Sequence, residues 1–161
     1  MTARMDSPAG PMRLVSDGGA LTQVMFAESV DESEPTGQHD PLLHEARCQL
    51  TAYFAGTRTD FDLPLELRGT EFQRRVWEQL RRIPFGATTS YGAIAARLGM
   101  RPGAARAVGL ANGANPIAIV VPCHRVIGAN GTLIGYAGGL PRKRFLLALE
   151  APTAQAGLFD A

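Results

Sequence analysis

The chain has 161 residues, of which 45% are hydrophobic and 19% are charged, and its formal net charge is +1. This length suits one modest globular protein or two small packed domains. No apolar run approaches the ~20 residues that a membrane-spanning helix needs, and the N-terminus lacks the apolar core of a secretory signal. These features predict a cytoplasmic protein with no membrane partner.

The thiols and imidazoles are few. The chain has two cysteines, Cys48 and Cys123, and three histidines, His39, His44 and His124. Two cysteines do not make a disulfide framework, and a reactive thiol needs a reducing compartment. The five side chains form no close cluster with metal-ligand spacing. We therefore predict no metal site and no cofactor.

Charge is divided unevenly along the chain. Residues 1–68 carry five basic and eleven acidic residues, a net charge of −6, whereas residues 69–150 carry eleven basic and three acidic residues, a net charge of +8. A basic half in a nearly neutral protein is typical of a face that binds a polyanion. The alternative is that the arginines only form the solvated faces of helices.

The N-terminal part alternates between short strands and one helix. Two apolar runs, Met12–Ser16 and Leu21–Phe26, flank a glycine turn and predict a β-hairpin. The spacing of apolar residues predicts a helix over Pro41–Phe54, in which we expect Cys48 to be a small buried hydrophobe. Alternation over Phe61–Leu67 predicts a third strand. We place the first domain at residues 1–68, a second at 69–150 and a flexible tail at 151–161.

The second part begins with three predicted helices. The first covers Thr70–Ile83 and ends before Pro84. The second covers Tyr91–Leu98, is capped by Ser90 and is stopped by Gly99. The third runs from about Ala104 to Asn112. Two short helices joined by a tight turn are typical of a helix-turn-helix.

The third helix is unusually smooth. It is built mainly from alanine and glycine, and Arg106 is the only long polar side chain inside it. Glycine in a helix costs about 1 kcal/mol relative to alanine, so close approach to another surface should compensate. A groove that receives Arg106 is one such surface, and tight packing inside the protein is the other.

A reactive pair follows an apolar, strand-like run. Residues 117–121 are all apolar, and Pro122 then ends regular pairing before Cys123 and His124. A thiol beside a base and a guanidinium, here Arg125, can be made available as the thiolate. Adjacent side chains of a strand point to opposite faces. The thiol and the imidazole therefore meet only if the chain turns sharply, or they communicate through a water.

Five ordered motifs resemble those of the O6-alkylguanine-DNA alkyltransferases, also called methylated-DNA–protein-cysteine methyltransferases. The similarity is strong over residues 69–150 and looser before them. The motifs are Ser90-Tyr91-Gly92, Ala105-Arg106-Ala107-Val108-Gly109, Asn115-Pro116 with Pro122-Cys123-His124-Arg125-Val126, Gly135-Tyr136-Ala137-Gly138-Gly139, and Leu146-Leu147-Ala148-Leu149-Glu150.

The resemblance implies a fold in two parts. The first would be an α/β domain of the ribonuclease-H type, and the second a mainly α domain with a helix-turn-helix and an active-site cysteine. The helix-turn-helix would dock in the minor groove of alkylated double-stranded DNA through Ala104, Ala105 and Gly109. The damaged base would be flipped out. Arg106 would fill the gap in the stack, and Tyr91 would help rotate the nucleotide and bind the base at N3.

The resemblance also implies roles around the cysteine. His124 and Glu150 would deprotonate Cys123 through a water, and Asn115 would hold the turn before the cysteine. Backbone carbonyls at Cys123 and Val126 and an N–H near Ala137 would read the base. The pocket residues implied are Val126, Tyr136, Ala137 and Gly138. Alanine at position 137, where many family members have serine, would widen the pocket for larger alkyl groups.

The implied reaction is direct reversal of DNA damage. A thiolate attacks the alkyl carbon on O6 of guanine, or on O4 of thymine. As negative charge develops on the leaving guanine, a phenol such as Tyr91 can donate to its N3. The thioether product has no carbonyl for water to attack, so each molecule acts once.

Three other functions compete with alkyl transfer. A generic cysteine hydrolase is disfavoured because the thiol and the base are adjacent in sequence. A non-enzymatic protein that binds alkylated DNA would lack the acceptor thiol. A sequence-specific transcription factor should carry several base-reading side chains on its recognition helix, and this helix offers only Arg106 and Asn112.

The tail suggests a further partner. Residues 155–159, Gln-Ala-Gly-Leu-Phe, resemble the short peptide that bacterial replication proteins insert into the sliding clamp. A frayed terminus is the alternative. The acidic N-terminal half would face away from DNA and would be structural or would join neighbouring copies along the duplex.

Overall fold

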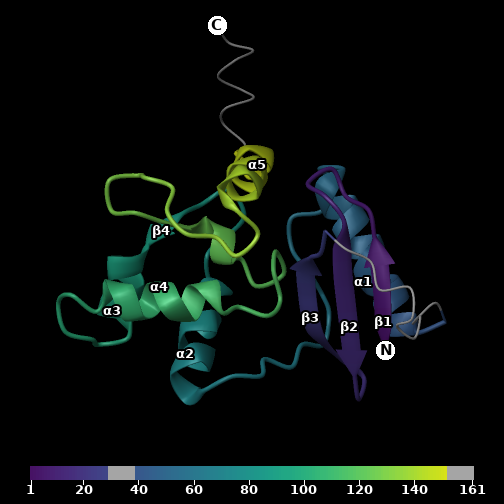
Figure 1. Cartoon of the computed structure of the whole chain (residues 1–161), viewed down its shortest axis with the longest axis horizontal. Coiled ribbons are helices and arrows are strands. Elements are labelled where there is room, and N and C mark those ends of the chain that lie inside the picture. Colours follow the sequence, from purple (N-terminus) through teal and green to yellow (C-terminus); the bar gives the residue numbers. More distant parts are fainter. Residues whose placement is uncertain (29–38, 152–161) are drawn as a thin grey trace, which may run out of the picture. The chain divides into compact units, whose positions relative to one another are not determined.

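The chain divides into two compact units, shown in the computed structural model of Figure 1. The structure describes residues 1–28 and 39–151. The first unit contains residues 1–70 and 116–120, and the second contains residues 71–115 and the chain from 121 onward. The predicted boundary after residue 68 did not anticipate that residues 116–120 return to the first unit.

The first unit is built on a three-stranded antiparallel sheet (Figure 1). Its strands follow chain order: β1 (Thr2–Met5), β2 (Met12–Asp17) and β3 (Ala20–Phe26). The predicted hairpin of β2 and β3 is confirmed, and both glycines of its turn have positive φ. Strand β1 was not predicted from the sequence, because its four residues are too few to establish an alternating pattern.

Helix α1 (Pro41–Phe54) packs on one face of this sheet, as Figure 1 shows. The Asp40 carboxylate caps its N-terminus by accepting from the Leu42 and Leu43 amides, and Ser16 of β2 donates to the same carboxylate at 2.5 Å. The buried stripe contains Leu43, Ala46, Leu50 and Tyr53. Cys48 lies on the opposite side of the helix and is exposed, so its expected burial is wrong.

The free edge of β3 pairs with two separate short segments. Leu21 bridges to Leu65, and Val24 bridges to Ile117. The predicted strand at residues 61–67 is therefore wrong: the segment alternates between exposed and partly buried residues, but it pairs at one position only. Pro64 can offer only its carbonyl, which the Leu21 amide uses, because proline has no N–H to extend the ladder.

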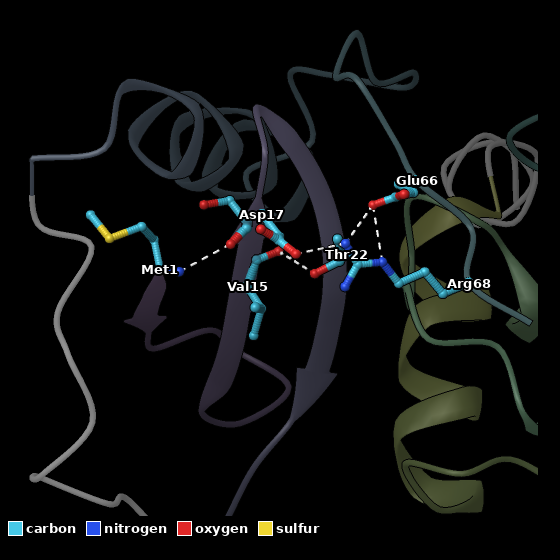
Figure 2. A network of polar contacts seen from close by, with 7 residues as sticks. Met1, Val15, Asp17, Thr22, Glu66 and Arg68 are labelled. Atoms are coloured by element: carbon cyan, nitrogen blue, oxygen red, sulfur yellow. Dashed lines mark hydrogen bonds and ion pairs between the residues drawn. The ribbon is translucent and has the colours of Figure 1, made fainter.

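A polar network closes one end of the first unit (Figure 2). Arg68 donates to Asp17 at 2.7 Å and to Glu66 at 2.6 Å, and the Met1 ammonium donates to the Ser16 carbonyl at 3.0 Å. The Arg68 guanidinium holds the pKa of Asp17 below its usual value. Because these side chains are more than half exposed, solvent screens the ion pairs and they add little stability.

The second unit is mainly helical. It contains α2 (Glu71–Leu80), α3 (Tyr91–Arg97), α4 (Ala105–Gly113) and α5 (Leu140–Glu150). The predicted Ser90 cap of α3 and the left-handed Gly99 after it are confirmed. Helix α2 ends three residues earlier than predicted, because the amides of Arg82 and Ile83 bond three residues back. Trp77 of α2 donates to the Ala111 carbonyl of α4 at 2.8 Å.

The run before the cysteine is a series of turns. Val120 donates to the Ala118 carbonyl and Cys123 donates to the Val121 carbonyl, each spanning two residues, and Ile119 has φ 70°. The strand-like expectation for residues 117–121 is therefore wrong beyond the single bridge at Ile117. Cys123–Arg125 then forms the 3₁₀ helix η1. The chain thus makes the sharp turn that the sequence left open.

One small parallel pair completes the second unit. Strand β4 (Thr89–Ser90) pairs with β5 (Val126–Ile127), which follows η1 directly. This pairing links the start of α3 to the end of the cysteine turn.

Over residues 1–28 and 39–151, each helix is too short or too polar to cross a bilayer.

Candidate active site

Cys123 is a buried thiol at the start of η1. The relative exposure of Cys123 is 5%. Burial raises the pKa of the thiol, whereas a hydrogen bond from the Asn115 amide and the charge of Lys143 act to lower it. The backbone N–H groups of Cys123 and His124 also lower the pKa, so the thiolate is favoured by four neighbouring groups against the effect of burial.

His124 and Arg125 share one buried carboxylate at the end of α5. Glu150 lies 2.7 Å from His124 Nε2 and accepts from Arg125 Nε at 2.7 Å and from Arg125 Nη2 at 3.0 Å. Arg125 also donates to the Ile83 carbonyl at 2.7 Å and lies over the Phe85 ring. The guanidinium balances the carboxylate charge and fixes its two oxygens.

The imidazole of His124 is held neutral. Burial lowers its pKa, although Glu150 opposes this effect, and Arg125 already neutralises that carboxylate. A neutral ring that donates from Nε2 to Glu150 leaves the Nδ1 lone pair as an acceptor. Within the described residues Nδ1 is buried and has no hydrogen-bond partner. His124 is therefore poised to accept a proton at Nδ1.

Two asparagines three residues apart hold the backbone on either side of Pro122. Asn115 donates to the Val121 carbonyl at 2.8 Å, and Asn112 donates to the Cys123 carbonyl at 3.3 Å. The sequence marked Asn112 as a possible base-reading side chain, but it is 4% exposed and faces the cysteine turn instead. The Cys123 carbonyl also accepts from the Val126 amide, so two donors already occupy it.

Tyr91 and Lys143 form a second polar group beside the cysteine. The Tyr91 hydroxyl donates to the Ile134 carbonyl at 2.8 Å. Lys143 is fully buried and donates to the carbonyls of Ile134 and Gly135 and to the Tyr91 oxygen, at 2.9, 3.1 and 3.3 Å. Burial raises the pKa of Tyr91 and lowers that of Lys143, and both groups interact with the charge of Cys123.

An apolar cavity opens between α3, α4 and the loop before α5. Its volume is about 340 Å³. Leu110 and Ile134 on its wall are 73% and 49% exposed. An added Cβ at Gly109 would lie 3.7 Å from the Tyr91 ring, at ordinary contact distance, so the ring lies directly beside the helix at this position. The lining residues are Tyr91, Ala105, Arg106, Gly109, Leu110, Ile134 and Gly135.

Known proteins match both units. Models of the 6-O-methylguanine DNA methyltransferase DNA-binding domain and ribonuclease-like domain match residues 71–152 and 2–67. The chain is 56% identical to a methylated-DNA–protein-cysteine methyltransferase of Mycobacterium tuberculosis, over 96% of this chain and 94% of the relative. The chain belongs to the methylated-DNA–protein-cysteine methyltransferase family.

Solved structures support the same assignment. The crystal structure of Mycobacterium tuberculosis OGT in complex with DNA has a TM-score of 0.83 and 56% identity, and covers 93% of this chain and 92% of that chain. An O6-methylguanine DNA methyltransferase from Methanococcus jannaschii has a TM-score of 0.70 and 28% identity, and covers 94% and 93%. The expected ribonuclease-like domain followed by a mainly helical DNA-binding domain is thereby confirmed.

The remaining residues that the methyltransferase resemblance marked are not among those that line this cavity. Val126 is buried in β5, and the hydroxyl of Tyr136 is buried with its pKa raised by desolvation. Ala137 is exposed, and the Gly138 carbonyl accepts from Arg142 at 3.4 Å. Ala104 precedes α4 and provides no side-chain cap.

Lys143 is the residue that the methyltransferase motifs did not single out. The helical spacing of the sequence could have identified it, because positions 143, 146 and 150 lie on one face of a helix. All three residues are buried. A lysine on the same stripe as Leu146 and Glu150 is a buried cation and needs a partner.

Among the described residues there is no group of three His, Cys, Asp or Glu side chains that could hold a metal ion.

Proposed function

We propose that this protein repairs DNA by transferring an alkyl group from O6 of guanine, and from O4 of thymine, to Cys123. Membership of the methyltransferase family supports this reaction. The observation that carries the assignment to Cys123 is its position, buried beside the Asn115 amide and next in sequence to the His124–Glu150 pair. Cys48, in contrast, is exposed on α1.

The proton leaves Cys123 by way of His124. Nδ1 of the neutral ring has its lone pair available within the described residues, and a water joining it to the thiol would carry the proton to the ring. Glu150 then stabilises the imidazolium, since its carboxylate already contacts Nε2 at 2.7 Å. Because Glu150 also binds Arg125, its position is fixed before the reaction.

Tyr91 and Lys143 serve the leaving group. The thiolate attacks the alkyl carbon in line, the C–S bond forms, and the C–O6 bond electrons pass to guanine. Tyr91 donates its proton toward N3 of the departing base, and the ammonium of Lys143 stabilises the charge that develops on the tyrosine oxygen. Tyr91 must first exchange the Ile134 carbonyl for the base.

The product limits each molecule to one reaction. Alkylated Cys123 is a thioether, and water has no electrophilic carbonyl to attack, as it would in a thioester. The protein is therefore a stoichiometric acceptor. Val126, Tyr136, Ala137 and Gly138 would form the pocket that recognises the base. Gly138, which has no side chain, would let the backbone approach the base closely.

The helix-turn-helix of α3 and α4 is the proposed DNA interface. Ala104, Ala105 and Gly109 give α4 a smooth surface that fits a minor groove, and the exposed Arg106 beside the cavity can occupy the stack when a nucleotide leaves it. The basic composition of this half supports binding to the phosphate backbone.

Replacing Arg106 with alanine should slow repair of duplex DNA while leaving the chemistry intact. We expect at least a tenfold loss in methyl transfer from a duplex, because the flipped nucleotide loses the group that holds its place. Transfer from the free base O6-benzylguanine should be unchanged. Equal losses on duplex and free base would contradict a DNA-specific role for Arg106.

Intact-protein mass after incubation with methylated duplex DNA tests the function itself. The wild-type chain should gain one methyl group, located on Cys123 by peptide mapping, and should gain no second one. Cys123→Ser should gain none, and Cys48→Ser should behave as the wild type. Several lesions cleared per molecule, or clearance by Cys123→Ser, would overturn the proposal.

Two further partners are proposed, a sliding clamp and neighbouring copies of this chain on DNA. Gln155–Phe159 lies outside the described residues, and its Gln-x-x-Leu-Phe pattern supports tethering to a bacterial sliding clamp. Neighbouring copies along the duplex would meet through the acidic N-terminal half. A reactive thiol needs a reducing environment, which supports action in the cytoplasm.

A further inference from the structure

Asn112 is a buried asparagine whose amide is only half hydrogen bonded. Its Nδ2 donates to the Cys123 carbonyl, while its Oδ1 is buried and has no partner within the described residues. Asparagine is a poor helix former, and a buried amide oxygen without a donor is destabilising. An apolar side chain would avoid both penalties. Fold stability therefore does not explain an asparagine at this position of α4.

The amide has a close counterpart at Asn115. The Asn115 backbone N–H donates to the Asn112 carbonyl at 3.2 Å, which ties the two residues together at the end of the helix. Their side chains donate to the Val121 and Cys123 carbonyls. One helix end thus supplies a donor on either side of Pro122, directly before the nucleophile.

The segment that carries the nucleophile needs external support. Cys123 enters a three-residue 3₁₀ helix from an inverse γ-turn centred on Pro122, and such short elements contain few backbone hydrogen bonds to hold them in place. In-line displacement requires the sulfur to be held in reach of the alkyl carbon, and a displacement of about 1 Å can cost ~10²-fold in rate.

We infer that Asn112 is a positioning residue, whose amide fixes the Cys123 backbone so that the sulfur is aligned with the alkyl group. This inference rests on the proposed transfer to Cys123. It makes Asn112 and Asn115 a pair of amide clamps, one on each carbonyl that flanks Pro122. Asn112 acts through the backbone and touches neither sulfur nor base.

An opposite role for Asn112 is also testable. The resemblance implied that the Cys123 carbonyl reads the base, yet that carbonyl already accepts from Val126 and Asn112. If the base had to displace Asn112, removing the amide would speed the reaction. The clamp predicts that removing it slows the reaction. The Asn115 bond of 2.8 Å to the neighbouring carbonyl favours the clamp.

The experiment compares Asn112→Leu and Asn112→Ala with the wild type in single-turnover methyl transfer from an O6-methylguanine duplex. Both variants lack the donor, and they bracket the volume of asparagine. We expect the rate constant at saturating protein to fall at least fivefold in both, with the half-saturating concentration unchanged. Unfolding should also be followed by the fluorescence of Trp77. We expect the fall in rate constant not to correlate with the change in the free energy of unfolding.

Gln49→Leu is the matched control. Gln49 is a buried amide in the first unit, and it is fully bonded to Glu45 and to both backbone groups of Asp62. Its replacement should lower stability and leave the rate constant unchanged.

The outcomes separate the clamp from the reaction itself. An unchanged or faster rate in either folded Asn112 variant overturns the inference, and if leucine prevents folding the alanine variant decides. A wild-type protein that gains no methyl group would overturn the proposed function instead.

Discussion

Replacing Lys143 with methionine should reduce methyl transfer at pH 7 by about tenfold or more and shift its pH profile to higher pH. The ammonium stabilises the Cys123 thiolate, so its loss leaves burial less opposed and raises the pKa of the thiol further. Each pKa unit lowers the thiolate fraction tenfold below the pKa. Tyr91 also loses the donor to its oxygen, so part of the loss should persist at high pH.

The measurement is the single-turnover rate constant from pH 6 to 10, alongside the rate of Cys123 alkylation by iodoacetamide as a direct probe of the thiolate. Lys143→Arg, which keeps the charge, should retain the wild-type midpoint of both profiles. Identical midpoints for Lys143→Met and the wild type would show that the lysine does not support the thiolate.

Replacing Glu150 with alanine should have the largest effect on stability, a loss of about 3–5 kcal/mol in the free energy of unfolding. The carboxylate is 2% exposed and binds two side chains. Its removal leaves the buried guanidinium of Arg125 without an opposite charge, which is far more costly than losing an exposed ion pair. Because His124 also loses its partner, methyl transfer should fall as well.

Urea unfolding monitored by Trp77 fluorescence checks this expectation, since Trp77 is the only tryptophan and is buried in the second unit. Arg68→Ala is the control, because it removes two exposed ion pairs in the first unit and should leave the unfolding midpoint unchanged. A loss below about 1 kcal/mol in Glu150→Ala would contradict a buried ionic centre.

The sequence predicted elements wherever local signals were strong. Ser90 before α3, Gly99 after it and the glycine turn between β2 and β3 each force a backbone conformation, so these features were predicted correctly. Residues 61–67 and 117–121 carried strand-like patterns, but an apolar run reports burial and not pairing. Residues 117–121 are buried or half-buried, and residues 61–67 alternate between half-buried and exposed, yet each segment bridges to β3 at one residue only.

The candidate site was predicted mainly through motif resemblance, and the structure adds what motifs do not encode. Contacts between residues far apart in sequence, such as Arg125 with Glu150 and Lys143 with Tyr91, depend on how α5 packs. Asn112 illustrates the limit, because a polar residue in a predicted recognition helix is interpreted as a DNA contact until its burial is known.

The return of residues 116–120 to the first unit has a consequence for dissecting this protein. Ile117 and Ile119 are almost fully buried, and Ile117 pairs with β3. A fragment lacking residues 1–70 would therefore expose two isoleucines immediately upstream of its nucleophile. Deleting the N-terminal half should thus yield an aggregation-prone, catalytically impaired polypeptide, even though every proposed catalytic side chain would still be present.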